Sequence, residues 1–441
     1  MKIEIERSAF AEIVGSAAKA LAVRPAIPTL AGLLLTADAE AGTLRAAAFD
    51  FELAVRATAP ARVGESGTVL VSGRLLAEIT RVLPDVPVEL VVEGGQRSGG
   101  GGERGDGQGD VGGQSGSGGH GGASGQPSSA SSGVLGGHLM LTCGAYRYTL
   151  ACMPVQEYPA LPAFPSVVGT VGGAALATAA ARAAMAAERD DTLPFLTGAR
   201  LEFGPAYLRM VSTDRYRLAR VDVPWQPADE AEADDGQPSA LVPARALLEA
   251  ARLLPGAEQV RIGLGDGLLG LAVGGVELTL RQLDGEFIRY AQLFPDEYTG
   301  EAVLEVAPLT EAIRAIALVA ERHTPVRLEL VPGQVTVSAG SGDHALADVT
   351  LEVGYEGEPV VIAANPAFLL DGLGALGTPY VRLRYPAKIR PVFLSPLTEL
   401  EAGGAGAGDA GAGRAETGGA VTAAEALFHY LFIPSRGAER G

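Results

Sequence analysis

The sequence has little cysteine, few aromatic residues and a deficit of basic charge. Its 441 residues include 2 Cys and 1 Trp, and the formal net charge is -18. Two thiols cannot staple so long a chain and are typical of a reducing compartment. The negative charge argues against nucleic-acid binding by wrapping, because that affinity comes from cations that neutralise phosphates. The charge does not exclude DNA binding that depends on the shape of the protein. Salt screens charges beyond a Debye length of about 8 Å, so a local basic surface can act independently of distant acidic groups.

Membrane-spanning runs and catalytic motifs are also missing. No apolar run reaches the length of about 18 residues that a spanning helix needs, and residues 1–7 alternate polar with apolar side chains. We therefore expect a cytoplasmic protein with no membrane partner. The 5 His and 2 Cys do not have the spacing of a metal site. No phosphate-binding loop or nucleophile elbow lies in ordered sequence, so we expect no cofactor.

Glycine is plentiful, with 60 residues, but much of it is confined to two segments. Residues 94–137 are mostly Gly, Ser, Gln, Asp and Ala, and residues 401–421 are a Gly/Ala run. Lengthening a hairpin tip costs only about 0.6 kcal/mol per doubling, so both are interpreted as disordered inserts. The first joins two strands at Glu93 and His138. The remaining chain suffices for three domains of ordinary size.

An internal repeat organises that remainder. An Arg, Glu, Arg, Pro frame with constant spacing spans residues 74–84 and 245–255, each followed by an apolar strand, and a weaker copy spans 366–376. Each unit starts with a small amphipathic helix and contains an alternating hairpin. The helices are expected at 8–22, 175–189 and 308–321. The pattern predicts an α+β fold of antiparallel sheets with helices on one face.

The repeat predicts three domains, residues 1–164, 165–300 and 301–441. Apolar strands at the edge of each unit must be covered, and a closed ring would cover them. Three units could form a triangle, or half of a six-unit ring made by a dimer.

Several stretches resemble the bacterial DNA polymerase III beta subunit family, the sliding clamps. They are residues 24–34, 213–219, 284–287, 293–295 and 430–434. Together, and in this order, these stretches are a specific signal for the family, whereas any one of them alone would be a weak one. The resemblance implies three repeated DNA-clamp domains per chain in a head-to-tail homodimeric ring. Antiparallel sheets would lie outside, and helices would line a central hole for duplex DNA. It also implies a non-catalytic processivity factor that an external ATP-driven loader opens.

A clamp that slides must bind DNA without reading its sequence. The DNA-binding candidates are arginines on or beside the predicted helices: Arg24, Arg74, Arg81, Arg245, Arg252 and Arg314. Arg24 matches a family position, and the others are inferred from their placement. The alternative is that they belong to ordinary solvated helix faces.

The resemblance implies a groove between the second and third domains for short peptide motifs of DNA polymerase subunits and the clamp loader. Carried over to this sequence, its residues are Leu196, Thr213, Arg215, Tyr216, Arg217, Leu218, Ile288, Gln292, Leu293, Phe432, Ile433, Pro434, Ser435 and Arg436. An apolar floor with a polar rim suits an extended peptide. From the residues alone, Leu196, Leu218 and Leu293 could equally be core side chains.

The sequence departs from the family at the groove. Ile288 stands where a proline is usual, Ser435 where an apolar residue is expected, and Gly437 where the chain usually has its terminal leucine. The alternative hypothesis is therefore a specialised or duplicate clamp whose altered groove tolerates a clamp-targeting inhibitor.

Two further expectations concern the dimer and catalysis. The dimer contact should join the first domain of one chain to the third of the other, through Tyr148, Leu150, Ala317 and Leu318. The alternative from another class is a hydrolase that uses Asp50 or Asp214. Their recurrence at one repeat position favours a structural role in a turn, because an active site would be made once.

Ser435→Met should change the affinity of a clamp-binding peptide, because filling or emptying a buried apolar position is worth about 2 to 5 kcal/mol. A binding titration of the native and variant chains measures this. Equal affinities would contradict a functional departure at Ser435.

Overall fold

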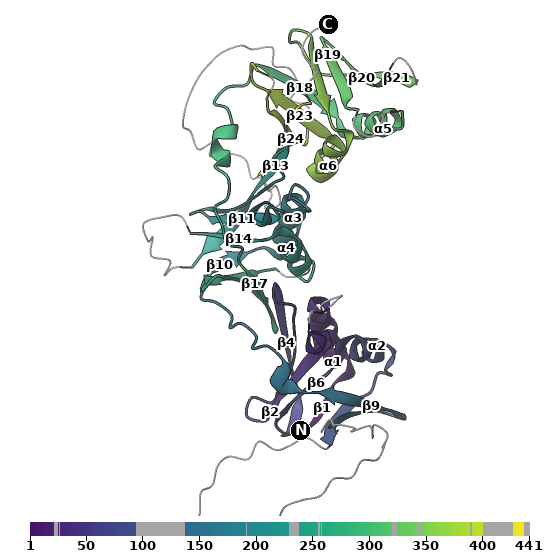
Figure 1. The fold of residues 1–441 in the computed structure, drawn as a ribbon, viewed down its shortest axis with the longest axis vertical. Helices are drawn as coiled ribbons and strands as arrows, with labels where there is room; N and C mark the ends of the chain where they lie inside the picture. The colour runs from purple at the N-terminus through teal and green to yellow at the C-terminus, as the bar shows by residue number, and fades with distance from the viewer. Residues whose placement is uncertain are drawn as a thin grey trace, which may run out of the picture. The chain divides into compact units, whose positions relative to one another are not determined.

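A computed structural model describes residues 1–21, 25, 27–93, 137–190, 192–228, 238–254, 256, 258–319, 324–341, 345–388, 390–399 and 427–435 (Figure 1). Apart from Gly137, both predicted inserts lie outside these ranges. The chain divides into two compact units, Met1–Ala48 with Thr58–Pro159, and Phe49–Ala57 with Ala160–Gly441. In the described ranges no helix is both long and apolar enough to cross a membrane.

The first unit packs a pair of helices against antiparallel strands. Its elements are β1 (Lys2–Ile5), α1 (Arg7–Ala17), β2 (Gly32–Asp38), β3 (Thr43–Phe49), β5 (Arg62–Glu65), β6 (Gly67–Ser72), α2 (Gly73–Val82), β7 (Val88–Glu93), β8 (His138–Cys143) and β9 (Tyr146–Met153). Helices α1 and α2 lie side by side (Figure 1). In α1 the buried side chains are Phe10, Ile13, Val14 and Ala17, the spacing of one helix face. Glu93 pairs with His138, which confirms the predicted place of the first insert.

The second unit contains the rest of the repeat. Its middle segment comprises β10 (Val167–Val171), α3 (Gly173–Ala184), β11 (Gly198–Phe203), β12 (Tyr207–Thr213), β13 (Arg217–Pro227), β14 (Ser239–Pro243), α4 (Ala244–Ala251), β15 (Val260–Gly265), β16 (Leu268–Val273) and β17 (Val276–Arg281). Its C-terminal segment comprises β18 (Gly300–Glu305), α5 (Val306–Ile316), β19 (Val326–Val331), β20 (Gln334–Ser341), β21 (Ala345–Glu352), β22 (Val360–Ala364), α6 (Pro366–Leu376), β23 (Tyr380–Tyr385), β24 (Val392–Leu397) and β25 (Leu427–Phe432). Strand β4 (Leu53–Pro60) pairs with β17.

One antiparallel sheet runs through both segments of the second unit. Its order is β14–β11–β12–β13–β25–β24–β23–β18. Strand β25 lies between β13 and β24, and its pairing with β13 runs from Arg217 opposite Phe432 to Asp222 opposite Leu427. Helices α3 and α4 pack together, as do α5 and α6 (Figure 1). The predicted α+β fold with antiparallel sheets is confirmed.

The turns after β3 and β12 have the same structure. Asp50 Oδ1 accepts hydrogen bonds from the backbone N–H groups of Glu52 (3.0 Å) and Leu53 (2.7 Å). Asp214 Oδ1 accepts equivalent bonds from Tyr216 (3.0 Å) and Arg217 (2.9 Å). In each turn the residue after the aspartate has φ of 76°, in the left-handed region.

The recurrent aspartate is therefore a turn residue, as its repetition predicted. Its carboxylate holds a left-handed turn by binding two backbone N–H groups. Across the part of the chain that the structure describes, no group of three His, Cys, Asp or Glu side chains is placed to hold a metal ion.

Asp50→Ala should lower the free energy of unfolding by about 1–2 kcal/mol, because two backbone N–H groups lose a charged acceptor. Chemical denaturation followed by circular dichroism measures the change. Asp284→Ala, at an exposed loop carboxylate, serves as the control, and an equal effect of both substitutions would contradict the turn role.

Candidate functional site

An apolar cluster forms where the middle and C-terminal segments meet. Its buried members are Val211, Leu218, Leu241, Phe287, Tyr290, Phe393 and Leu431, and partly buried members packed against them are Phe195, Leu283, Ile288, Leu293, Phe294 and Tyr298. The cluster brings together the predicted groove residues Leu218, Ile288 and Leu293. A floor of buried side chains with partly exposed apolar edges can accept apolar side chains of a ligand.

The linker between β17 and β18 packs its aromatic rings on the continuous sheet. Phe294 lies 5.5 Å from the ring of Phe393 on β24, and the guanidinium of Arg220 on β13 lies 5.2 Å from the Phe294 ring centre. Tyr298 also contacts Phe393, at 5.2 Å, and Arg384 lies over the Tyr298 ring. These cation–π and edge contacts fix the linker that carries Ile288 and Leu293.

The pKa values of two ionisable groups beside the linker, Asp222 and His429, are lowered by their surroundings. Asp222 accepts hydrogen bonds from Arg209 at 2.6 and 2.9 Å and from Arg220 at 2.9 Å. Burial alone would raise the pKa of Asp222, but the bonds from both arginines outweigh burial and lower it. Burial, together with the charge of Arg220, lowers the pKa of His429 on β25. Near neutral pH we therefore expect an ionised Asp222 and an uncharged His429.

The turn at residues 213–217 holds the terminal segment that follows β25. Thr213 Oγ1 donates to the carbonyl of Arg217 at 2.6 Å, and the backbone N–H of Arg215 donates to Thr213 Oγ1 at 3.1 Å. The carbonyl of Tyr216 accepts from the N–H of Ile433 at 2.7 Å. Tyr216 and Ile433 are both exposed large apolar side chains. The turn and the terminal segment thus form one hydrogen-bonded edge beside the apolar cluster.

Beyond Ile433, the terminal segment is bound to the C-terminal segment through Ser435. Its backbone N–H donates to the carbonyl of Ala363 on β22 at 2.8 Å, and the residue is half-buried. Ser435, one of the positions at which the sequence departs from the resemblance, is therefore held by a backbone hydrogen bond and is partly accessible.

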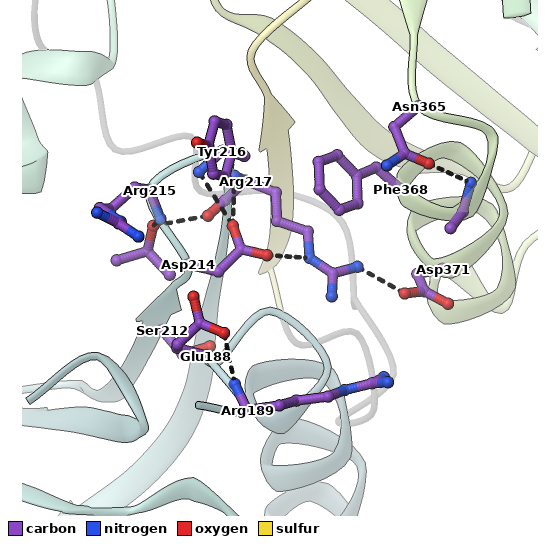
Figure 2. A network of polar contacts seen from close by, with 12 residues as sticks. Glu188, Arg189, Ser212, Asp214, Arg215, Tyr216, Arg217, Asn365, Phe368 and Asp371 are labelled. Carbon is purple, nitrogen blue, oxygen red and sulfur yellow. Dashed lines mark hydrogen bonds and ion pairs between the residues drawn. The ribbon is translucent and has the colours of Figure 1, made fainter. Parts of the chain in front are cut away.

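The Arg217 side chain runs from the turn towards α6 (Figure 2). Its Nε donates to Asp214 Oδ2 at 2.9 Å, and a terminal nitrogen donates to Asp371 Oδ2 on α6 at 2.5 Å. The guanidinium lies 4.7 Å from the ring centre of Phe368. Only 6% of the Arg217 side chain is exposed. Burial would lower the pKa of Arg217, but the bond to Asp371 and neighbouring groups raise it, so the group stays charged.

The predicted groove residues fall into distinct positions. The turn supplies Thr213, Arg215, Tyr216 and Arg217, the terminal segment supplies Phe432, Ile433, Pro434 and Ser435, and the linker supplies Ile288, Gln292 and Leu293. Leu196, Leu218 and Phe432 are fully buried, and Thr213 and Arg217 nearly so, so these side chains support the site from within. Arg436 lies outside the described residues.

Sequence reasoning missed several side chains of this site. The linker aromatics Phe294 and Tyr298 lie in or beside the quoted family motifs, but they were not assigned to the groove. Phe368 and Asp371 come from α6, and they reach the turn only through the tertiary fold. No local pattern marks α6 as a neighbour of the turn.

Five of the predicted DNA-binding arginines lie in the described residues, and all five are exposed. Arg74 and Arg81 lie on α2, Arg245 on α4, Arg252 directly after α4 and Arg314 on α5. Arg252 pairs with the neighbouring Glu249 at 2.9 Å, with both side chains largely exposed. Arg24 lies outside the described residues. Exposed guanidinium groups on helices can meet phosphates without contacting base edges.

The predicted dimer residues differ in accessibility. Leu318, which follows α5, is 86% exposed, and Ala317 beside it is half-buried. On β9, Tyr148 is half-buried, whereas Leu150 is 3% exposed. Leu150 therefore packs within its own unit and has almost no surface to lose to a partner.

Comparisons with known proteins match the whole repeat. Models of the N-terminal, central and C-terminal domains of the DNA polymerase III beta subunit match residues 1–99, 170–288 and 291–402. A beta sliding clamp of Streptomyces coelicolor is 40% identical over 91% of this chain and 96% of its own. A beta sliding clamp homolog named GriR, from Streptomyces muensis, is 36% identical over 87% and 91%. A Pseudomonas aeruginosa clamp solved with griselimycin has a TM-score of 0.76 and 22% identity, covering 99% of both chains.

Leu318 is exposed in the single chain, and we expect it to be buried between the two chains of the dimer. Leu318→Asp should then yield monomers, because burying a carboxylate opposes association. Mass in solution at micromolar concentration measures this. Leu346→Asp, at another exposed leucine of the C-terminal segment, is the comparison variant. An unchanged mass for Leu318→Asp would contradict its predicted place in the interface.

Proposed function

The chain belongs to the DNA polymerase III beta subunit family, the beta sliding clamps, and we propose that two copies form a head-to-tail ring around duplex DNA. The observation that carries this proposal is the match of three successive beta-subunit domains, in order, along one chain. We propose domains at residues 1–164, 165–300 and 301–441. Strand β18 begins at Gly300, and the model of the C-terminal domain matches from residue 291.

The protein is a non-catalytic processivity factor, and its mechanism is topological. A closed ring cannot leave DNA sideways, so it stays bound while each phosphate contact is weak. The exposed arginines Arg74, Arg81, Arg245, Arg252 and Arg314 supply such contacts against an overall charge of -18. Because none of this requires base readout, the ring can slide over any duplex sequence. An external ATP-driven loader opens the ring, and the chain acts in the cytoplasm, where it meets bacterial chromosomal DNA.

Partner recognition takes place at the groove beside the apolar cluster. An extended peptide can place leucine or aromatic anchors against Ile288, Leu293 and Phe294, whose side chains are partly exposed. The edge formed by Tyr216 and Ile433 adjoins this floor along the chain, because Leu218 and Leu431 are members of the cluster. We propose that DNA polymerase subunits and the clamp loader bind here through short peptide motifs.

A second candidate is a specialised clamp with an inhibitor-tolerant groove. The observation that favours it is the half-buried Ser435, at a position where the family resemblance leads us to expect an apolar side chain. A groove that has lost one apolar contact can discriminate between two ligands that depend on it to different degrees.

Loading the protein onto nicked circular DNA with a clamp loader tests the ring. We expect retention on the circle, with a half-life that shortens sharply when the DNA is linearised, because the ring then slides off the ends. Equal retention on circular and linear DNA, or no retention on either, would exclude a topological clamp.

Arg245→Glu with Arg252→Glu should reduce loading several-fold and weaken its salt dependence, because phosphate neutralisation is lost. Arg62→Glu, at an arginine exposed on β5 outside the helices, is the matched charge reversal. If the double variant and the Arg62→Glu control reduced loading to the same extent, the helix arginines would have no special role in DNA binding.

A further inference from the structure

Arg217 connects two elements that are far apart in the sequence. Its guanidinium binds Asp214, whose other carboxylate oxygen organises the turn at residues 213–217. It also binds Asp371 of α6, 154 residues further along the chain. Figure 2 shows these contacts, which run from the turn through Arg217 to Asp371 on α6. The turn is thus tied through Arg217 to a helix of the C-terminal segment.

Helix α6 is anchored independently of Asp371. Arg182 of α3 donates to the carbonyls of Ala375 and Leu376 at 2.9 and 2.8 Å, at the end of α6. The Tyr430 hydroxyl of β25 donates to the Phe368 carbonyl at 2.9 Å. Because these bonds hold α6 without Asp371, the carboxylate can be neutralised while the helix stays in place.

The turn determines where the groove edge lies. Tyr216 and Ile433 are joined by a backbone hydrogen bond, so the terminal segment follows the turn. Arg215 has φ of 76°, a conformation that costs energy for a residue with a side chain. Such a turn keeps one shape only when several contacts fix it.

We propose that Asp371 is a positioning residue for peptide binding: through Arg217 it holds the turn at 213–217, so that Tyr216 and Ile433 border the groove before the peptide arrives. This inference rests on the proposed function of the groove. Asp371 itself does not contact the peptide. It raises affinity by preorganisation, which removes an ordering cost from the binding step.

The geometry also limits the size of the effect. The Asp371 side chain is 41% exposed, so water screens part of its interaction, whereas Arg217 is 6% exposed and retains Asp214 when Asp371 is neutralised. We therefore expect a moderate change in affinity without unfolding.

The test is the binding of a clamp-binding peptide to the full chain. Asp371→Asn should weaken peptide affinity by about 3- to 10-fold, the range for one charge-assisted hydrogen bond that is partly screened. Asp371→Glu, which keeps the carboxylate, should restore most of it. Glu311→Gln removes an exposed carboxylate from α5 and should leave affinity unchanged. Retention of Asp371→Asn on nicked circular DNA should equal that of the native chain.

A double-mutant cycle separates this route from others. In an Arg217→Gln background, Asp371→Asn should have no further effect on affinity. An equal additional loss there, or a loss of DNA retention by Asp371→Asn, would overturn the inference. So would native affinity of Asp371→Asn. If the native chain binds no clamp-binding peptide at all, the proposed groove fails instead.

Discussion

The pairing of β13 with β25 is the contact on which the proposed groove depends. It joins the strands of the middle and C-terminal segments into one sheet, and it places the turn before β13 beside the terminal segment after β25. The linker that connects the two segments then packs its aromatic rings across the joined strands. Backbone hydrogen bonds set the register, so the groove edge is built from main chain as much as from side chains.

Arginine has different roles in the two kinds of site. Arg74, Arg81, Arg245, Arg252 and Arg314, on or directly beside helices, are exposed, and we propose that they attract phosphate weakly enough for the protein to slide. At the junction of the second unit, Arg217, Arg209 and Arg220 are largely withdrawn from water and bound to carboxylates. The cost of burying such charges is met only when every partner is present, which makes them suited to fixing geometry.

The sequence predicted the parts of the fold that follow local rules. The first helix was expected at 8–22 and spans Arg7–Ala17, and the place of the first insert between Glu93 and His138 was confirmed. The role of Asp50 and Asp214 could be predicted because a turn residue recurs with its repeat. The gathering of Leu218, Ile288 and Leu293 came from the family resemblance.

Other features depend on tertiary contacts that no local pattern carries. Asp371 was not among the predicted site residues, and only the fold brings it to Arg217. Arg217 was expected among the groove residues, yet its side chain runs from the turn towards α6. Leu150 alternates on its strand as an interface residue would, but the core of its own unit covers it.

The central place of β25 also affects how the chain matures. During synthesis residues 427–432 leave the ribosome after every other strand of that sheet, yet they lie between β13 and β24. Before these residues are made, β13 and β24 each lack the neighbouring strand with which they pair in the folded chain. The proposed groove therefore forms only after residues 427–432 have been translated, and a chain that ends before them would lack this edge of the sheet.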